Sequence, residues 1–246
     1  MAKDMMYQAV KDIAKKKGIK LSAQHDLYKM DSPYFLNAFY SDIEDKKEKK
    51  MCVNLTYEAK YCYFDDLKIY IVEPDSTVKL TDKVRANSVI RFRSVIHEEV
   101  MEFDCDGEEE SYVEIAEKTM AHIEKWYRNF FEDVKNNYGN LENYFLSNRD
   151  SFLMQAAFIY LHQEKYDLAE ECIQKLPPKL YSVRSITPKT EEQKLRLTAS
   201  NAANFGSSYH RDDMDCIIDY VAAKKRGLEW TAERSCYGLL KEEREN

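Results

Sequence analysis

Six cysteines and five histidines could supply a nucleophile, a general base or a zinc ligand in this chain. A cysteine nucleophile needs a histidine base within reach, and a zinc site needs closely spaced cysteines and histidines. The sequence has no Cys-x-x-Cys, no Gly-x-Ser-x-Gly, no His-Glu-x-x-His and no glycine-rich phosphate loop. The cysteines are Cys52, Cys62, Cys105, Cys172, Cys216 and Cys236. Because they are scattered, we expect reduced, mostly buried thiols, with no metal and no cofactor.

The acidic run Glu102–Glu110 contains the Asp-x-Asp-Gly pattern of a calcium-binding loop. Such a loop needs a helix on both sides and a glutamate as its twelfth residue, and counting from Glu102 that residue is Val113. A turn at Asp106 and Gly107 that brings acids to a helix N-terminus explains the run better, because the helix dipole favours negative charge there.

The tetrapeptide His210-Arg211-Asp212-Asp213 has the residue order of the catalytic triplet of protein kinases. A kinase also needs a glycine-rich loop, a strand lysine with its helix glutamate and a metal-binding Asp-Phe-Gly, which this sequence lacks. Asp212 or Asp213 instead suits the N-cap of a following helix.

Four further polar residues would line a small-ligand or enzyme site if two domains of the chain enclosed a cleft. They are Arg91, Arg93, His97 and His210. The basic run Lys46–Lys50 is interrupted by Glu48 and lies between two expected strands, so it is best explained as a solvated hairpin tip.

The chain is rich in tyrosine, with 18 residues of this type. Tyr57, Tyr61, Tyr63 and Tyr70 are grouped in one region and could form an exposed face that binds a partner, because tyrosine is enriched at interfaces. The alternative is that they pack within the fold with their hydroxyls near solvent. Both interpretations stay open, and packing is the favoured one.

Composition and charge limit the possible functions. With 44% apolar residues among 246, the chain can bury a core, and its formal net charge of −7 argues against nucleic acid as a partner. An acidic surface suits a basic protein partner. No apolar run approaches the length of a membrane span, and the N-terminal residues have no signal-peptide pattern, so we expect a cytoplasmic protein that does not bind membranes.

The first part of the sequence predicts a helix, an antiparallel meander and a long helix. Apolar residues at helical spacing predict a helix over residues 3–17, and Ser32-Pro33 precedes a strand. Met51, Val53, Leu55 and Tyr57 alternate with polar residues, which is the best strand signal of the chain. The sequence LKIYIVE at 67–73 predicts the next strand, and 81–105 predicts further sheet. A capping box at Ser111 and Glu114 would begin the long helix, with an apolar stripe over Ala116, Ile123, Trp126, Tyr127, Phe130, Phe131 and Val134.

From about Leu141 onward the sequence predicts helices and no strand. Asp167 with Glu170 would cap one helix, and Thr190 with Gln193 would cap another that continues toward Gly206. Further helices are expected from about Asp213 to Gly227 and from about Trp230 to Glu243.

Residues Phe152–Pro177 predict two antiparallel helices with small residues where the helices approach each other. Ala156, Ala157, Tyr160, Tyr166, Ala169 and Ile173 fall near the small and aromatic positions of a tetratricopeptide helical pair, which this segment resembles. The resemblance covers about one tenth of the chain and implies a module that binds partners, with Tyr160 and Tyr166 between packed helices.

Together these patterns predict an α+β domain over residues 1–138, followed by a helical domain over 139–246, with a hinge at Tyr138, Gly139 and Asn140. The organisation resembles that of small bacterial proteins that include immunity-type inhibitors. We therefore expect a non-catalytic protein that binds another protein through Tyr57, Tyr61, Tyr63, Tyr70, Tyr160 and Tyr166. The alternative is an enzyme or small-ligand binder with its site between the two domains.

Overall fold

The structure is a computed structural model that describes residues 2–87, 95–176, 183–206 and 208–245. The chain divides into two compact units. The first unit is Met1–Cys62 with Thr81–Tyr144, and the second is Tyr63–Leu80 with Phe145–Asn246. This division is not sequential, because the segment Tyr63–Leu80 belongs to the second unit, whereas the sequence suggested one boundary near Gly139.

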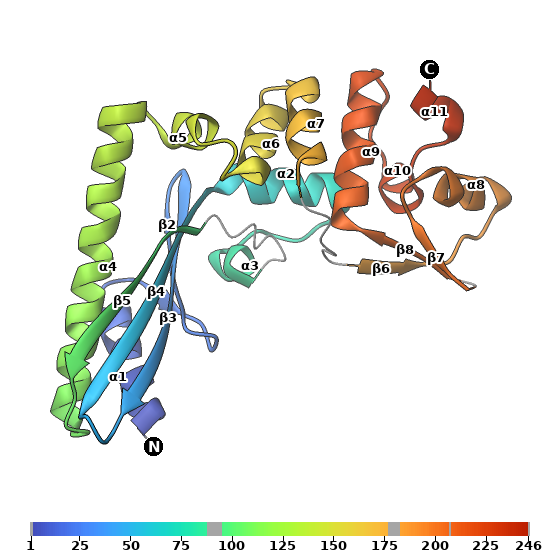
Figure 1. Cartoon of the computed structure of the whole chain (residues 1–246). Coiled ribbons are helices and arrows are strands. Elements are labelled where there is room, and N and C mark those ends of the chain that lie inside the picture. The colour runs from blue at the N-terminus through green and yellow to red at the C-terminus, as the bar shows by residue number, and fades with distance from the viewer. Residues whose placement is uncertain (1, 88–94, 177–182, 207, 246) are drawn as a thin grey trace. The chain divides into compact units, whose positions relative to one another are not determined.

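The first unit is an antiparallel sheet with α1 and α4 on one face, while α3 lies near β2 (Figure 1). Its helices are α1 (Ala2–Lys16), α3 (Asp82–Asn87) and α4 (Glu109–Tyr138). Its strands are β1 (Lys20–Leu21), β2 (Asp26–Asp31), β3 (Tyr34–Asp45), β4 (Lys50–Tyr61) and β5 (Val95–Asp104). The strand order is β1-β2-β3-β4-β5, so every strand pairs with its neighbour in the sequence.

The alternation predicted for β4 is confirmed. Met51, Val53, Leu55 and Tyr57 are almost completely buried, while the residues between them are half-exposed. The buried face is covered by α4, where the Tyr57 ring stacks on Trp126 with a centroid distance of 4.1 Å. The Tyr127 hydroxyl lies 2.6 Å from the Asn37 carbonyl and 2.8 Å from that of Glu58, so it can donate to either strand. Helix α1 packs beside α4.

Three sequence predictions for this region are corrected. The segment LKIYIVE is not a strand, because Cys62–Val72 forms helix α2, whose buried residues Phe64, Lys68, Ile71 and Val72 recur at helical spacing. Residues 82–87 form α3, and only 95–104 of the expected sheet region is a strand; residues 88–94 lie outside the described part of the chain. The proposed cap at Ser111 is wrong, because α4 begins at Glu109 and Glu108 occupies the N-cap position.

The second unit combines helices with a small sheet. Its helices are α2, the end of α5 (Leu141–Ser147), α6 (Leu153–His162), α7 (Tyr166–Gln174), α8 (Glu191–Ala199), α9 (Asp213–Lys225), α10 (Ala232–Tyr237) and α11 (Lys241–Glu245). Its strands are β6 (Val183–Ile186), β7 (Ala203–Phe205) and β8 (Ser208–Asp212), in the order β6-β8-β7. The prediction that no strand follows Leu141 is therefore wrong, although the α+β class is confirmed.

The helical pair expected over Phe152–Pro177 is present as α6 and α7, up to the last described residue of that segment, Leu176. Ala156, Ala157 and Ala169 are fully buried, so the two helices pack closely. Asp167 does not cap α7, because Lys165 occupies the N-cap and makes no side-chain cap.

The predictions for the last four helices of the chain are partly right. Thr190 caps α8 by accepting from the Gln193 amide, but Gln193 returns to the amide of Lys189 and α8 ends at Ala199, before Gly206. Asp212 caps α9 with a complete capping box that includes Asp215. The last predicted helix is two short helices separated at Gly238, where φ is 87°.

Candidate functional site

The six tyrosines singled out for partner binding do not form one surface. Tyr57 and Tyr61 lie in the first unit, with exposed fractions of 0% and 8%, so their interpretation as an exposed face is wrong. The other four lie in the second unit. Tyr70 is 43% exposed, while Tyr63, Tyr160 and Tyr166 are half-buried. Tyr63 stacks on His162 with a centroid distance of 4.1 Å, which is a packing role.

The four residues suggested for a ligand cleft are not brought together within either unit as far as the described residues show. Arg91 and Arg93 lie outside the described residues. His97 lies on β5 in the first unit, and His210 lies on β8 in the second, where its ring meets the edge of Phe205 at 4.9 Å. Among the described residues, neither His97 nor His210 has a hydrogen-bonded side chain that could act with it as a nucleophile or a base.

A polar cluster that the sequence did not predict lies between β5 and α4. The Tyr57 hydroxyl donates to Glu99 Oε1 at 2.5 Å, and His122 Nε2 lies 2.8 Å from the same oxygen. Burial, and secondarily the bond to Glu99, raise the pKa of Tyr57 above its ordinary value, so this phenol stays protonated. The cluster joins the sheet to α4 through groups that satisfy one another, and we assign it a structural role.

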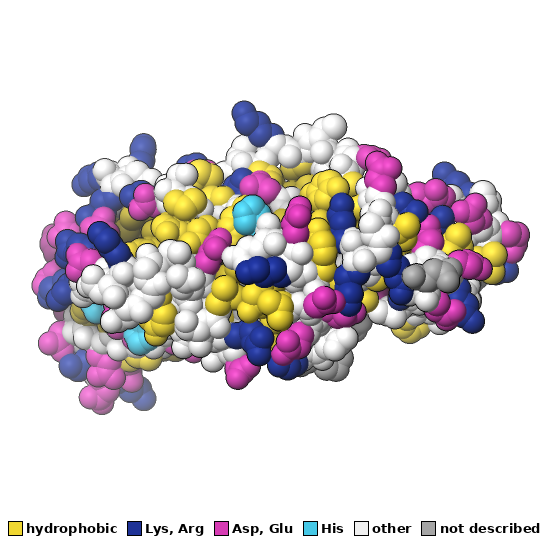
Figure 2. Space-filling view, turned by 90° about the horizontal axis from the view of Figure 1, so that it is seen from above, with side chains coloured by type: hydrophobic (Ala, Val, Ile, Leu, Met, Phe, Trp, Pro, Cys, Tyr) yellow, Lys and Arg dark blue, Asp and Glu magenta, His cyan; other side chains and the backbone are white. Residues whose placement is uncertain are grey.

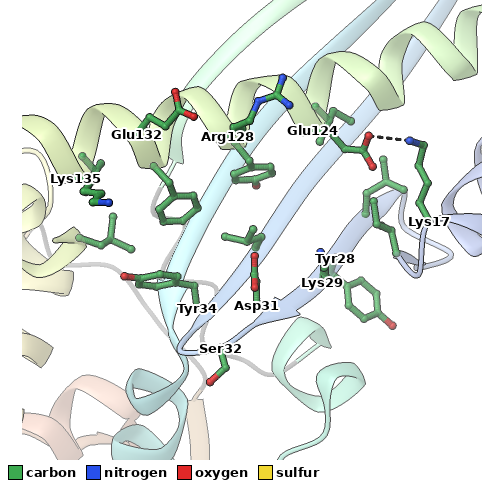
Figure 3. Close-up of a pocket in the computed structure, with 18 of the residues that line it drawn as sticks. Lys17, Tyr28, Lys29, Asp31, Ser32, Tyr34, Glu124, Arg128, Glu132 and Lys135 are labelled. Atoms are coloured by element: carbon green, nitrogen blue, oxygen red, sulfur yellow. Dashed lines mark hydrogen bonds and ion pairs between the residues drawn. The ribbon is translucent and has the colours of Figure 1, made fainter.

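A hollow within the first unit lies beside the second half of α4, and we call it the α4 groove. Its volume is about 880 Å³, and α4 lines one side while β2 and the beginning of β3 line the other (Figure 3). Its apolar lining consists of Ile19, Leu27, Leu36, Met120, Ile123, Tyr127, Phe131, Val134 and Leu141. Most of these side chains are nearly buried, whereas Phe131 is half-exposed and stacks on Tyr34 at 5.0 Å.

The groove lies along α4 in the direction in which α1 would continue beyond its C-terminal end. The Lys17 ammonium, just past the end of α1, pairs with Glu124 at 2.8 Å and so marks the point on α4 that α1 reaches. Beyond that point Tyr127, Phe131 and Val134 continue the same helical stripe toward the groove. The first half of the apolar stripe on α4 therefore packs beside α1, whereas the second half faces the groove.

Charged side chains of both signs surround the groove. Glu124, Arg128, Glu132 and Lys135 follow one another along α4, and Lys29 and Asp31 lie on β2 opposite them (Figure 3). Lys17 and Glu124 neutralise each other. The remaining charges nearly balance, so the groove offers no strong attraction to one sign of charge. On the face shown in Figure 2, basic and acidic side chains are likewise interspersed among apolar ones.

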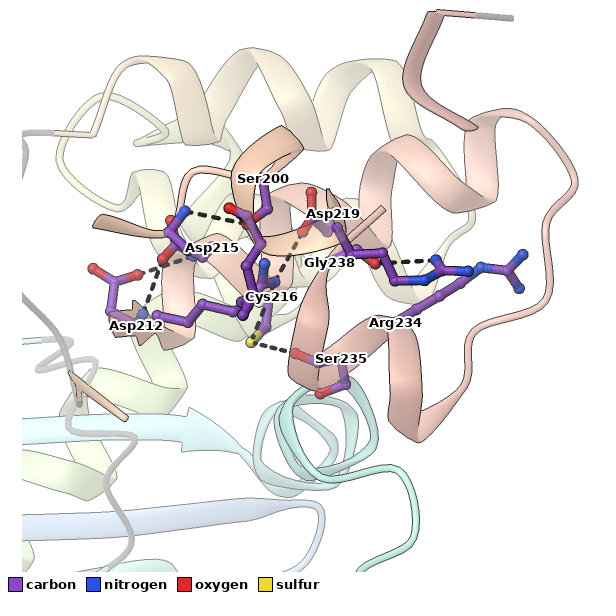
Figure 4. A network of polar contacts seen from close by, with 12 residues as sticks. Ser200, Asp212, Asp215, Cys216, Asp219, Arg234, Ser235 and Gly238 are labelled. Carbon is purple, nitrogen blue, oxygen red and sulfur yellow. Dashed lines mark hydrogen bonds and ion pairs between the residues drawn. The ribbon is translucent and has the colours of Figure 1, made fainter. Parts of the chain in front are cut away.

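The second unit contains a buried polar network that joins Arg211 to Cys216 and Asp219, and the latter two are labelled in Figure 4. Arg211 is completely buried and donates to Asp219 Oδ2 at 2.8 Å, and Arg244 pairs with the other oxygen of Asp219. The Cys216 thiol donates to the Ser235 carbonyl at 3.4 Å. Burial raises the pKa of this thiol, although Arg211 and Arg184 oppose the shift, so Cys216 is protonated and a poor nucleophile.

The network lies inside the fold, and some of its nitrogens have no partner among the described residues. Arg211 Nε and Nη1 are buried and have no hydrogen-bond acceptor in that part of the chain, and Gly238 lies against the same guanidinium. A Cβ on Gly238 would come within 2.6 Å of Arg211 Nη1, so the backbone leaves no space for a ligand on that side. We therefore assign the network to the stability of the unit.

Comparisons with known proteins add no further constraint: no family model, no curated protein and no solved structure matches this chain. Among the residues that the structure describes, no group of three or more His, Cys, Asp or Glu side chains is arranged to hold a metal ion. No helix in the described ranges is long and apolar enough to cross a membrane. The α4 groove is thus the feature of the described chain best suited to bind another molecule.

Proposed function

We propose that this protein is a non-catalytic binding protein that holds an amphipathic helical segment of a partner protein in the α4 groove. The observation that carries the proposal is the apolar stripe of α4, which continues past the end of α1 without a covering helix. A helix in the position that extends α1 would cover the half-exposed Phe131 and complete the burial of Tyr127 and Val134 beside it. Helix-in-groove recognition uses apolar anchors at helical spacing in this way.

The dimensions of the groove suit a short helix. Met120 and Val134 mark the two ends of the apolar lining on α4, and a helix rises about 1.5 Å per residue, so this part of α4 is about 21 Å long. A partner segment of about four turns would match it. The mixed charges around the groove suit a segment that carries both signs on its polar face, rather than a strongly basic one.

A small apolar ligand is the second candidate, and the volume of the groove favours it. Pockets for small molecules usually enclose about 300–1,000 Å³ and are lined mainly by apolar side chains with a few polar groups. The α4 groove, at about 880 Å³, lies in this range. The residues that would bind such a ligand are those that would bind a helix, so the experiment must separate the two.

The test uses a photo-crosslinking amino acid at position 131, followed by mass spectrometry of the products formed in a lysate of the source cells. We expect one protein to be crosslinked at this position through a segment with amphipathic helical periodicity. Placing the same amino acid at Phe205, which is 67% exposed on the second unit, provides the control. Equal crosslinking at both positions, or none at position 131, would contradict the proposal.

The variant Phe131→Glu supplies the functional counterpart. It places a charge at the half-exposed centre of the groove without removing a fully buried side chain. We expect this variant to lose the partner, while Phe205→Glu retains it. Native mass spectrometry of the purified protein separates the second candidate, because a small ligand would appear as an added mass that Phe131→Glu loses.

A further inference from the structure

The outer edge of β5 is a second surface of the first unit, independent of the α4 groove. β5 is ten residues long and is the last strand of the sheet, and among the described residues it pairs only with β4. The strand at the other end of the sheet, β1, has two residues. A long outer strand presents backbone N–H and C=O groups that can pair with a further strand.

β5 carries negative charge and no positive charge. Val95–Asp104 contains Glu98, Glu99, Glu102 and Asp104 but no lysine or arginine, and the acidic sequence continues to Glu110. Three of these carboxylates have partners, since Glu99 accepts from Tyr57, Glu98 accepts from the Thr56 hydroxyl at 3.4 Å, and Asp104 pairs with Lys50 at 2.7 Å. Glu98 and Glu102 are exposed and form no ion pair within the described chain.

The positions of these acids on the strand define one face of the edge. Glu98, Val100 and Glu102 point away from α4, because their register partners Thr56, Asn54 and Cys52 alternate with the buried residues of β4. Val100 is 62% exposed. A strand added to β5 would therefore meet carboxylates and one apolar side chain on this face.

Aromatic rings lie on the opposite face of β5. The exposed His97 ring is parallel to that of Trp126, with 5.6 Å between the centroids and 7° between the planes. Trp126 is half-exposed on α4. The Trp126 ring also stacks on Tyr57 and Phe130, so this side of the edge offers packed aromatic area, and the attraction for a cationic side chain comes from the carboxylates on the other side.

Charge distinguishes between the possible occupants of this edge. A second copy of β5 would place carboxylates opposite carboxylates, which destabilises a strand pair. A basic strand would place lysine or arginine opposite Glu98 and Glu102 and would also be attracted by the acidic run that follows. We propose that the outer edge of β5 binds a basic, extended segment of a partner protein by strand addition.

The probe for this proposal is a capped eight-residue peptide of alternating lysine and valine, labelled with fluorescein and titrated against the whole chain. We expect saturable binding, together with slower hydrogen exchange of the amides of residues 95–104. The double variant Glu98→Lys with Glu102→Lys should weaken binding about tenfold, which corresponds to about 1.4 kcal/mol for the loss of two surface ion pairs. Circular dichroism verifies that this variant is folded.

A matched charge change provides the control. Glu48→Lys with Glu117→Lys changes the net charge equally, and both residues are exposed and lie outside β5. We expect this variant to bind nearly as well as the unchanged chain, and Phe131→Glu to bind equally well. Absence of binding, equal loss in both double variants, or exchange protection outside residues 95–104 would overturn the proposal. Phe131→Glu tests binding in the α4 groove, whereas Glu98→Lys with Glu102→Lys tests binding at the edge of β5. Loss of binding at one site is therefore distinguishable from loss of binding at the other.

Discussion

At the residue scale, the most demanding feature is the burial of Arg211 and Asp219 in the second unit. The Asp219 side chain is 1% exposed and receives both Arg211 and Arg244. Such a pair stabilises little compared with apolar packing, but removing one partner leaves an uncompensated buried charge. The loss of either residue therefore lowers the stability of the fold by more than the net free energy of the ion pair.

The first prediction concerns this dependence. We expect Asp219→Ala to lower the free energy of unfolding by about 3–5 kcal/mol, because Arg211 would remain buried without its carboxylate. Urea unfolding followed by circular dichroism measures the change. Glu171→Ala is the control, since its pair with Lys175 lies on the surface and solvent screens it. Similar losses in the two variants would show that Asp219 is not a buried partner.

The second prediction concerns pH and Glu243. Its carboxylate accepts from Arg234 at 2.7 Å, from Arg196 at 2.8 Å and from the Leu240 amide at 2.9 Å. Burial alone would raise the pKa of Glu243, but these hydrogen bonds and charges outweigh it and lower the pKa below its ordinary value of 4.5. The carboxylate therefore stabilises the fold above the unfolded-state pKa, and this stabilisation is lost as the pH falls through the folded-state pKa.

The measurement compares the intact chain with Glu243→Gln over a range of pH. We expect the difference in unfolding free energy to be constant above about pH 5.5 and to shrink as the pH falls below about 4.5. A difference that stays the same across this range would contradict the lowered pKa.

At the scale of elements, the cap of α9 gives the third prediction. Asp212 accepts from the Asp215 amide at 2.9 Å, and Asp215 accepts from the Asp212 amide at 3.0 Å. We expect Asp212→Ala to lower the free energy of unfolding by about 1 kcal/mol, because a helix amide loses its acceptor. Asp167→Ala is the contrast, since Asp167 lies inside the first turn of α7 and does not cap it. Equal effects on thermal unfolding would show that Asp212 does not act as a cap.

The sequence predicts those elements whose surroundings leave a periodic pattern. β4 was found because one of its faces is buried and the other is partly exposed, so Met51 to Tyr57 alternate. α2 was mistaken for a strand because Ile69, Tyr70 and Ile71 favour strands, whereas packing within the unit holds them in a helix. β6, β7 and β8 have five residues or fewer, which is too short for a pattern to emerge.

The α4 groove could not be predicted for a different reason. Phe131 and Val134 were placed correctly on the apolar stripe of α4, but their spacing does not show where α1 ends beside them. That point depends on the packing of two helices far apart in the sequence, which Lys17 and Glu124 reveal only in the structure. The burial of Tyr57 likewise depends on α4, so composition alone placed a buried side chain on the surface.

At the scale of the whole molecule, the two units are interleaved in the sequence. α2 contributes to the second unit, where Trp230 Nε1 donates to the Ile71 carbonyl at 2.9 Å and Ser235 Oγ donates to that of Val72 at 2.6 Å. Lys68 pairs with Asp213 at 2.8 Å, and both side chains are 6% exposed. The second unit is therefore incomplete without Tyr63–Leu80.

The fourth prediction follows from this interleaving. We expect a fragment of residues 145–246 to lack cooperative unfolding, because Asp213, Trp230 and Ser235 would lose their partners on α2. Joining residues 63–80 to the start of this fragment through a flexible linker should restore a cooperative transition in circular dichroism. If the fragment without residues 63–80 unfolds as cooperatively as the joined form, α2 is dispensable.

The place of α2 in the chain also affects how the protein emerges from the ribosome. Ile71 is made 159 residues before Trp230, which hydrogen-bonds to it. At about 5–20 residues per second, translation of the intervening residues takes roughly 10–30 s, and until then the apolar residues of α2 lack the last of their neighbours. During that time they are exposed to chaperones and to other nascent chains. Expression at low temperature, or with abundant chaperones, should therefore increase the soluble yield of this protein.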